Sequence, residues 1–225
     1  MRGKLIVIEG TDCSGKETQT KKLISKLREQ NIFIDNFSFP NYASATGKII
    51  AGCYLGKEGY SECLFEEGSA NVDPKVASLY YTADRIYNIN KINLLLENGR
   101  NVILDRYIYS NMAHQAGKID DSVERHEMYN WLDKLEFELA NLPKPDIAVF
   151  LHMPTENSKV LRENREETLD EHEKNNEYLK KSENAYLEIA KRYDMFTIEC
   201  VKNNQIKTIE EINNELYQYV LNKIA

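Results

Sequence analysis

A glycine-rich segment near the start of the chain has the residue types and spacing of a phosphate-binding loop. It runs from Gly10 to Lys16 and fits the pattern G-x-x-x-x-G-K. Glycines let the backbone curl until its amides point inward, the following helix adds partial positive charge, and Lys16 adds a full charge. The loop therefore predicts a nucleotide-phosphate site. The residues predicted to bind the nucleotide are Gly10, Thr11, Asp12, Cys13, Ser14, Gly15, Lys16, Glu17 and Thr18.

The position after Lys16 departs from the usual pattern of such loops. Glu17 stands where Ser or Thr normally supplies a hydroxyl to Mg²⁺, and Thr18 lies one residue further on. A Glu17 carboxylate or an intervening water could replace that hydroxyl. We expect a Mg²⁺ ion here, with Glu17, Thr18 and Asp105 as candidate ligands.

A second polar cluster, Asp105-Arg106-Tyr107, closes another apolar run. An acid at the carboxyl end of a neighbouring strand lies beside a phosphate loop, where it can bind Mg²⁺ or its waters. The planar fork of Arg106 suits the oxygens of a transferring phosphoryl group. Alone this signal is weak, because Asp and Arg often only end a strand and cap a helix. Beside a phosphate loop it is much more specific.

The elements that must position these groups follow from the apolar pattern. Short apolar runs occur at residues 4–9, 32–39, 101–105, 146–151 and 196–200. Runs of this length are typical of strands buried on both faces, and helical segments such as 18–29 and 74–97 lie between them. The alternation predicts an α/β fold with a five-stranded parallel sheet, helices on both faces and a single domain, 1–225. The strands' carboxyl ends then share one edge, where ligands bind.

Net charge, apolar runs and cysteine spacing argue against several classes of protein. The net charge is −7 and the sequence pI about 5.3, so a nucleic-acid partner is not expected. No apolar run approaches the ~20 residues needed to span a bilayer. Four cysteines lack metal-ligand spacing and are interpreted as reduced thiols of a cytoplasmic protein.

The chain resembles the thymidylate kinase family over nearly its whole length. The resemblance rests on Ile8-Glu9-Gly10-Thr11-Asp12, Gln19, Phe39-Pro40, Ala83-Asp84-Arg85, Asp105-Arg106-Tyr107, Ser110, Gln115-Ala116-Gly117, Leu142-Pro143-Lys144-Pro145-Asp146 and Asp170-x-x-Glu173. It implies a P-loop NTPase fold of the nucleoside monophosphate kinase type with a lid, ATP and dTMP as substrates, Mg²⁺ as cofactor, and a homodimer.

The same resemblance implies roles for residues around the phosphates. Lys16 holds the phosphates of ATP and stabilises the moving charge. Asp12 contacts the 3′-hydroxyl of dTMP, and Glu9 lies near the metal and the acceptor phosphate. Arg106 holds that acceptor phosphate, with Ser110 close by.

The resemblance also implies a base pocket. Phe39, Pro40 and Tyr107 line it, Tyr81 stacks near the base, Arg85 reaches a thymine carbonyl and Gln115 meets the base edge. Without the family match, Phe39 and Tyr81 would be read as core residues and Arg85 as a surface ion-pairing residue. We expect His114 and His126 to be ordinary surface or packing residues.

A lid is expected at about residues 156–175. Some members of the family carry an arginine inside the phosphate loop, but here that position is Cys13. The positive charge over the transferred phosphoryl group must then come from elsewhere, and Arg162 and Arg165 are the candidates. Acidic residues beside these arginines weaken this assignment, so a charged, solvent-exposed helix at 156–181 is the alternative to a lid.

Two other functions stay open. One is a kinase of the same architecture that acts on a nucleoside or a different monophosphate. The other is a P-loop nucleotide-binding module without transfer activity, which would have no need of Arg85 or the Phe39-Pro40 pocket. Residues 52–68, which are punctuated by glycines and predicted to loop out, have no assigned role.

Overall fold

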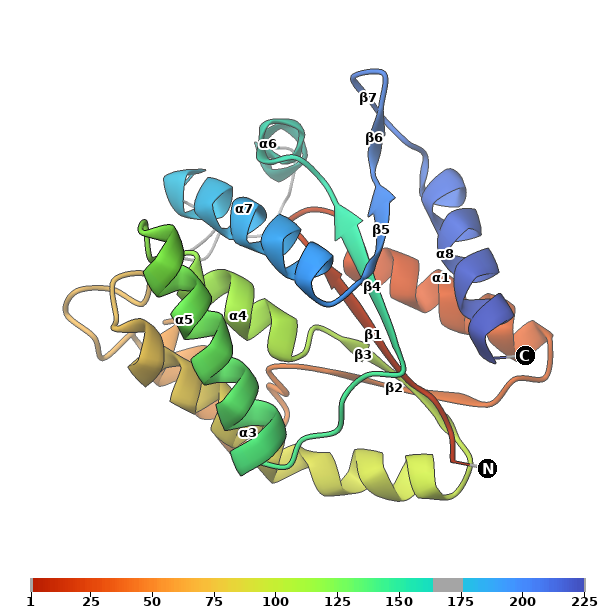
Figure 1. Cartoon of the computed structure of the whole chain (residues 1–225), viewed down its shortest axis with the longest axis horizontal. Helices are drawn as coiled ribbons and strands as arrows, with labels where there is room; N and C mark the ends of the chain where they lie inside the picture. The colour runs from red at the N-terminus through yellow and green to blue at the C-terminus, as the bar shows by residue number, and fades with distance from the viewer. Residues whose placement is uncertain (1, 164–175, 225) are drawn as a thin grey trace.

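Five parallel strands form the centre of the fold. The computed structural model describes residues 2–163 and 176–224. The strands lie in the order β2 (Ile34–Ser38), β3 (Asn101–Asp105), β1 (Leu5–Gly10), β4 (Ile147–His152) and β5 (Phe196–Glu199). Every neighbouring pair is parallel, so the carboxyl ends of all five strands lie at one edge (Figure 1). The predicted five-stranded parallel sheet is confirmed.

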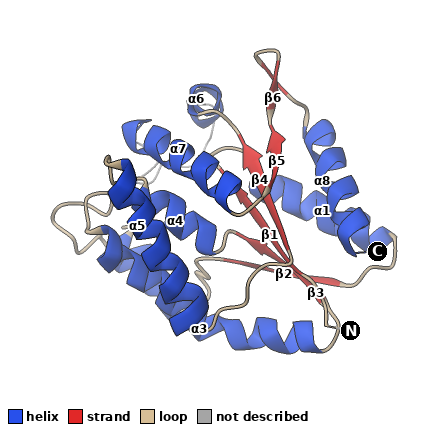
Figure 2. Cartoon of the chain, in the orientation of Figure 1, coloured by secondary structure: helices blue, strands red, loops and turns tan. Residues whose placement is uncertain are grey.

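Helices cover both faces of this sheet (Figure 2). One face is covered by α1 (Lys16–Glu29) and α8 (Ile209–Ile224), which pack against each other. The other is covered by α3 (Pro74–Glu97), α4 (Ile108–Ala116), α5 (Ser122–Asp133) and α7 (Asn176–Arg192). The smaller elements are α2 (Ala45–Ile49), η1 (Ile50–Tyr54), η2 (Lys134–Leu139), α6 (Thr155–Glu163), β6 (Val201–Lys202) and β7 (Gln205–Ile206). No helix among the described residues is both long enough and apolar enough to cross a membrane.

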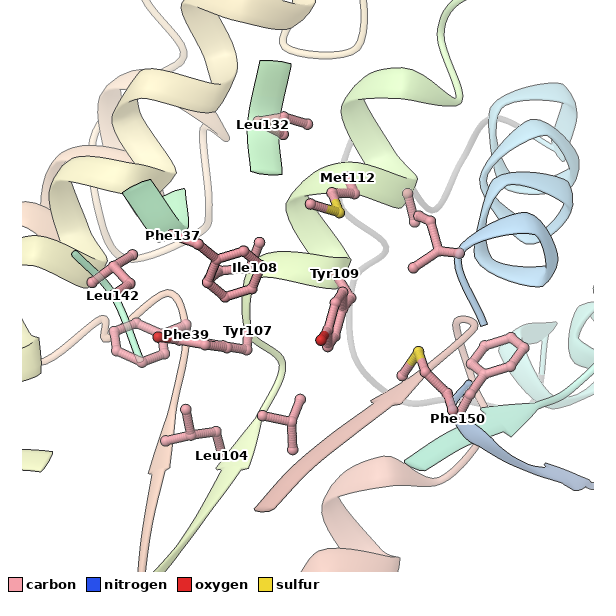
Figure 3. Close-up of a cluster of buried hydrophobic side chains, with 14 of the residues drawn as sticks. Phe39, Leu104, Tyr107, Ile108, Tyr109, Met112, Leu132, Phe137, Leu142 and Phe150 are labelled. Carbon is pink, nitrogen blue, oxygen red and sulfur yellow. The ribbon is translucent and has the colours of Figure 1, made fainter. Parts of the chain in front are cut away.

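The central strand β1 explains why its sequence reads as a continuous apolar run. Successive side chains point to opposite faces of a strand. Leu5 and Val7 enter the core under α3 and α4, whereas Ile6 and Ile8 enter the core under α1 and α8. All six residues of β1 are buried. Figure 3 shows the larger core, where aromatic and aliphatic side chains fill the space beneath α4. The glycine loop therefore starts from a strand held on both faces.

Residues 52–68 begin in η1 and continue without helix or strand, as predicted for an irregular segment. They are nevertheless packed. Tyr54 is 1% exposed, its hydroxyl donates to the Ser69 carbonyl at 2.9 Å, and its ring contacts Phe65 and Tyr81. This small core holds the segment against α3, beside the cavity described below.

Candidate active site

The glycine loop is held tightly at both ends. Gly15 has a φ of 75°, a left-handed conformation that favours glycine. A Cβ on Gly10 would lie 2.5 Å from Ser14 Oγ and 2.9 Å from Leu151 O, so a larger residue does not fit. The Thr11 hydroxyl donates to Met153 O at 2.7 Å and accepts from Met153 N at 2.9 Å. The loop is thus pinned to the residue that follows β4.

Lys16 folds back over the loop. Its ammonium group donates to Gly10 O at 3.0 Å and Thr11 O at 3.3 Å, and the side chain is only 8% exposed. Burial lowers the pKa of Lys16 to about 8, and Arg106 acts in the same direction, whereas Asp105 and Asp12 oppose both effects. A phosphate next to Lys16 would raise this pKa again and keep the ammonium group protonated, as a phosphate-binding lysine requires.

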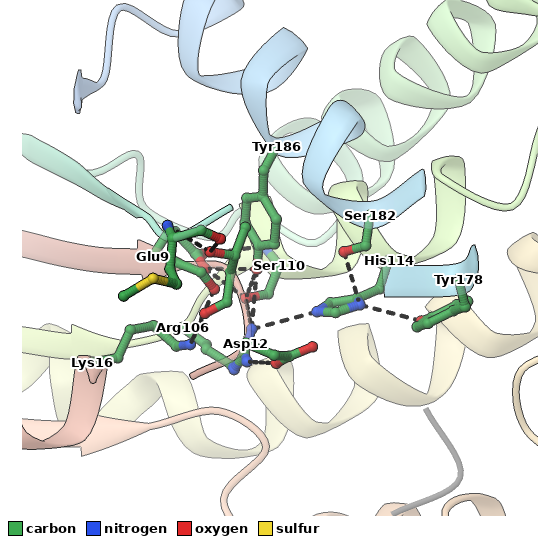
Figure 4. Close-up of polar contacts among 12 residues, drawn as sticks. Glu9, Asp12, Lys16, Arg106, Ser110, His114, Tyr178, Ser182 and Tyr186 are labelled. Carbon is green, nitrogen blue, oxygen red and sulfur yellow. Dashed lines mark hydrogen bonds and ion pairs between the residues drawn. The ribbon is translucent and has the colours of Figure 1, made fainter. Parts of the chain in front are cut away.

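Arg106 connects the glycine loop to the neighbouring helices (Figure 4). Nη2 donates to Asp12 Oδ1 at 3.0 Å, and Nη1 donates to Tyr186 OH at 3.0 Å and Ser110 Oγ at 3.2 Å. Its φ of 65° is unusual for a residue with a side chain and is the kind of strain found at functional sites. Burial opposes the charge, but Tyr186, Asp12 and nearby acids raise the pKa of Arg106, so the guanidinium stays charged.

Glu9 lies beneath this arginine and is completely buried. Its carboxylate accepts hydrogen bonds from Tyr107 N at 2.8 Å, Ser110 N at 3.1 Å and Ser110 Oγ at 2.5 Å. Burial raises the pKa of Glu9, while the bonds from Ser110 and Tyr107 and the charge of Arg106 lower it. Because α4 has no side-chain cap, Glu9 satisfies amides at its start and fixes the position of Arg106.

A cavity of about 210 Å³ opens beside the Asp12–Arg106 pair. Nine predicted residues line it: Asp12, Phe39, Pro40, Tyr81, Arg85, Arg106, Tyr107, Ser110 and Gln115. Five more do so that were not predicted as site residues: Tyr42, Leu55, Lys57, Asn111 and His114. His114, expected to be a surface or packing residue, packs against Tyr178 and also lines the cavity, and its Nε2 lies 3.4 Å from Arg106 Nη1. The peptide bond between Phe39 and Pro40 is cis.

Arg85 is not a surface residue but lies 2% exposed in the wall of this cavity. Its Nε donates to Glu136 Oε2 at 2.9 Å and its Nη2 to Glu136 Oε1. Glu136 is completely buried and was missed in the sequence, where it is one of two similar glutamates in the run Lys134–Leu139.

Two amide side chains in the wall have hydrogen-bonding capacity to spare. Asn111 Oδ1 and both polar atoms of Gln115 are buried and have no hydrogen-bond partner among the described residues. Burial raises the pKa of the Tyr54 hydroxyl, and the nearby Gln115 amide offsets part of that rise without reaching hydrogen-bonding geometry. Buried polar groups without partners are rare in folded proteins, so these atoms suit a polar ligand.

The three predicted metal ligands lie in different environments. Glu17 is 75% exposed and pairs with Lys21 at 2.5 Å along α1, and Thr18 is also exposed. Asp105, in contrast, raises the pKa of Lys16 and lies at the end of β3. No group of three or more His, Cys, Asp or Glu within the described ranges could hold a metal. Mg²⁺ commonly uses one or two carboxylates with phosphates and waters, so Asp105 fits as a partial ligand.

The expected lid falls largely on residues that the structure does not describe. Arg165 lies outside the described residues. Arg162 belongs to α6, and its side chain is likewise not described. The start of α6 is well defined, because Glu183 accepts from Thr155 N at 3.0 Å and Thr155 Oγ1 at 2.6 Å. The lid and its arginines therefore stay predictions.

The glycine loop, the lysine folded over it and the adjoining cavity together define a P-loop nucleotide-binding protein. The strand order and the layers of helices agree with that class. The chain belongs to the thymidylate kinase family, whose sequence model matches residues 8–212.

Individual relatives match over nearly the full length. The chain is 33% identical over 220 residues to a protein described as "Probable thymidylate kinase" from Methanocaldococcus jannaschii, covering 96% of this chain and 95% of that protein. It is 29% identical over 221 residues to the thymidylate kinase of Schizosaccharomyces pombe, covering 98% and 93%. The solved structure of thymidylate kinase from Candida albicans superposes with a TM-score of 0.73 at 28% identity, covering 98% of this chain and 92% of that one. The family prediction is confirmed.

Proposed function

We propose that this protein transfers the γ-phosphoryl group of ATP to the 5′-phosphate of dTMP, giving dTDP and ADP. One observation carries the proposal: Asp12 belongs to the glycine loop and lines the cavity, where it pairs with Arg106 at 3.0 Å. A donor phosphate in the loop and an acceptor phosphate in the cavity would thus meet at a shared boundary.

The donor side binds the triphosphate through the loop amides and Lys16. The Lys16 ammonium donates hydrogen bonds to the carbonyl oxygens of Gly10 and Thr11. The more negatively charged phosphate oxygens would replace those carbonyls. Asp105 would hold Mg²⁺ together with the phosphates, and the ion would neutralise charge that develops during transfer.

On the acceptor side, Arg106 holds the phosphate of dTMP and Asp12 contacts the 3′-hydroxyl. Arg85 and Gln115 meet the edge of the base, with Asn111 as a further polar contact. Phe39, Pro40 and Tyr81 line the same pocket. Since the acceptor is already an anion, no strong general base is needed, and positioning and charge neutralisation dominate.

The lid remains part of the proposal. Residues of the segment 156–175 would close over ATP within a single domain of residues 1–225, and Arg162 or Arg165 would stabilise the transferred group. Arg162→Ala and Arg165→Ala should be measured separately. The lid assignment fails if neither change lowers kcat at least about tenfold, equivalent to ~1.4 kcal/mol.

A panel of acceptors tests the choice of substrate. We expect kcat/KM with Mg·ATP to be higher for dTMP than for dUMP, dCMP, AMP or thymidine. Thymidine or AMP as the best acceptor would refute the proposed substrate. Nucleotide binding without acceptor-dependent release of ADP would instead support a non-catalytic P-loop module.

We further propose a homodimer, supported by an exposed apolar row on α3. Leu79, Ile86, Tyr87 and Leu94 are 50%, 47%, 63% and 59% exposed along the outside of this helix. Exposed apolar patches of this kind mark interaction surfaces. Light scattering should give the mass of two chains, and Ile86→Glu should reduce it to one. Leu64→Glu, at a 72% exposed leucine elsewhere, should leave the dimer intact.

A cytoplasmic location is proposed as well. The support is that Cys13, Cys53, Cys63 and Cys200 are all free thiols. Fractionation of the cells that make the protein would test it, and recovery outside the cytoplasmic fraction would refute it.

A further inference from the structure

Glu136 does not line the cavity, yet three side chains in and beside the cavity wall converge on its carboxylate: Arg85, Asn111 and Thr82. We propose that Glu136 is a positioning residue that fixes the order of hydrogen-bond donor and acceptor in this pocket, and so selects a base edge that presents a carbonyl beside an N–H. The inference rests on the proposed function, since it concerns how the same pocket distinguishes thymine from cytosine.

The first group is the guanidinium of Arg85. Nε and Nη2 face the two oxygens of Glu136, which forms a forked pair between side chains that are 2% and 0% exposed. Such a fork locks the plane of the guanidinium. Nη1 makes no hydrogen bond to any described residue. In the cavity wall, Arg85 therefore has a fixed nitrogen available to donate to a ligand oxygen.

The second group is the amide of Asn111. Its Nδ2 donates to Glu136 Oε1 at 3.0 Å and lies 3.4 Å from Ser78 O. Both neighbours are acceptors only, so a flipped amide would place oxygen against oxygen. The carboxylate and the carbonyl thus hold Nδ2 on their side, and Oδ1 is left as a buried acceptor with no partner in residues 2–163 or 176–224.

Arg85 and Asn111 share the oxygen Oε1 of Glu136, so they lie next to each other. The wall consequently offers a donor from Arg85 beside an acceptor from Asn111. Thymine presents the matching pair, the O4 carbonyl and the N3–H. Cytosine presents the reverse, an amino group and an unprotonated N3, which would leave donor against donor and acceptor against acceptor.

Four hydrogen bonds already engage the carboxylate of Glu136. Its two oxygens accept from Arg85 twice, from Asn111 and from Thr82 Oγ1 at 2.9 Å. It lies in η2, a π-helical turn, and such turns are frequent at functional sites. A carboxylate this saturated acts through its neighbours rather than as a base.

Glu136→Gln tests the inference. The Gln side chain has nearly the shape of Glu, but its NH₂ group is a donor in place of one of the two acceptor oxygens that face Arg85 and Asn111. With Mg·ATP, the ratio of kcat/KM for dTMP to that for dCMP should fall at least about tenfold. A purely structural residue would lower both values equally and leave the ratio unchanged. Glu138→Gln, an exposed neighbour on the same turn, is the matched control and should keep the wild-type ratio.

If Glu136→Gln does not fold, as judged by thermal unfolding, Glu136→Asp replaces it. This variant keeps the charge beside Arg85 but shortens the reach to Asn111, and its ratio should fall at least about threefold. An unchanged ratio in whichever variant folds overturns the role of Glu136. A wild-type protein that does not prefer dTMP to dCMP refutes the proposed function instead, so the two failures are distinguishable.

Discussion

Asp12 Oδ1 lies 3.0 Å from Nη2 of Arg106, and this pair joins two segments 94 residues apart in the chain. Asp12 belongs to the loop that follows β1, and Arg106 follows β3, the strand beside it. Parallel strands bring their carboxyl ends to one edge, so the pair lies where the donor and acceptor sites meet.

Replacing Arg106 with Met should lower kcat/KM for dTMP by about 100-fold, because the acceptor phosphate loses its fixed cation. Steady-state kinetics with varied dTMP would measure the loss. Arg100→Met, which breaks a partly exposed pair with Asp35, is the control and should keep normal kinetics. An Arg106→Met enzyme with activity within threefold of normal would remove Arg106 from the acceptor site.

The hydroxyl of Tyr186 should matter through Arg106. It lies 2.8 Å from Ser110 Oγ and 3.0 Å from Arg106 Nη1, so Tyr186→Phe removes one support of the guanidinium and keeps the ring. We expect kcat to fall about fivefold to tenfold with the folded structure retained. Tyr193→Phe loses a hydroxyl bonded to Asp133 and should not change kcat. Equal kinetics in both variants would contradict this role.

Lys57 should contribute to binding of the acceptor. It comes from the irregular segment after η1, lines the cavity and lies 5.3 Å from the centre of the Tyr42 ring. A cation at this position would attract a dianionic monophosphate, so Lys57→Ala should raise KM for dTMP about fivefold with a smaller change in kcat. Lys48→Ala, an exposed lysine on α2, is the comparison. Identical KM values for the two variants would leave the segment without a role in binding.

His152 should make stability depend on pH. Its Nδ1 lies 2.7 Å from Glu199 Oε2, and its Nε2 lies 3.2 Å from Glu183 Oε1. The hydrogen bond to Glu183 raises the pKa of His152 in the folded state, and this effect outweighs burial, which lowers it. A group with a raised folded pKa adds stability below its unfolded pKa, and that stability disappears as pH rises through the folded pKa.

His152→Gln should therefore lose about 1 kcal/mol of unfolding free energy under mildly acidic conditions and little under alkaline ones. The ionised carboxylate of Glu183, in contrast, contributes stability at higher pH, because its folded-state pKa is lowered. Burial would raise its pKa, but His152 and Thr155 lower it to about 2, so its contribution is lost only as pH falls toward that value. Urea unfolding across pH would separate the two effects. A constant difference between wild type and His152→Gln would contradict the assignment.

Sequence reasoning recovers the parts of the fold that local pattern determines. The strand at 101–105 and the helix at 74–97 have the predicted bounds, because an apolar run and a Pro at the helix start identify them. The glycine loop lies where its spacing predicts. The helix predicted from residue 18 instead starts at Lys16, since Gly15 completes the loop in the left-handed conformation.

Residues that depend on tertiary contacts could not be predicted. Glu136 and Glu138 look alike in the sequence, and only the packing of η2 against α3 and α4 buries the first and exposes the second. Tyr186 reaches Arg106 from α7, 80 residues further along the chain, whereas His114 lies only eight residues from it on α4. For Glu17, no local signal distinguishes a metal ligand from the partner of Lys21.

The central claim is that one phosphoryl group passes from the glycine loop to an acceptor in the cavity. Incubation of the protein with dTMP and Mg·ATP labelled with ³²P in the γ-position tests it directly. We predict that the label appears in the β-phosphate of dTDP, mole for mole with ADP, and that Lys16→Met loses nearly all of this transfer. Label that appears only as inorganic phosphate, or transfer that continues undiminished in Lys16→Met, would contradict the account.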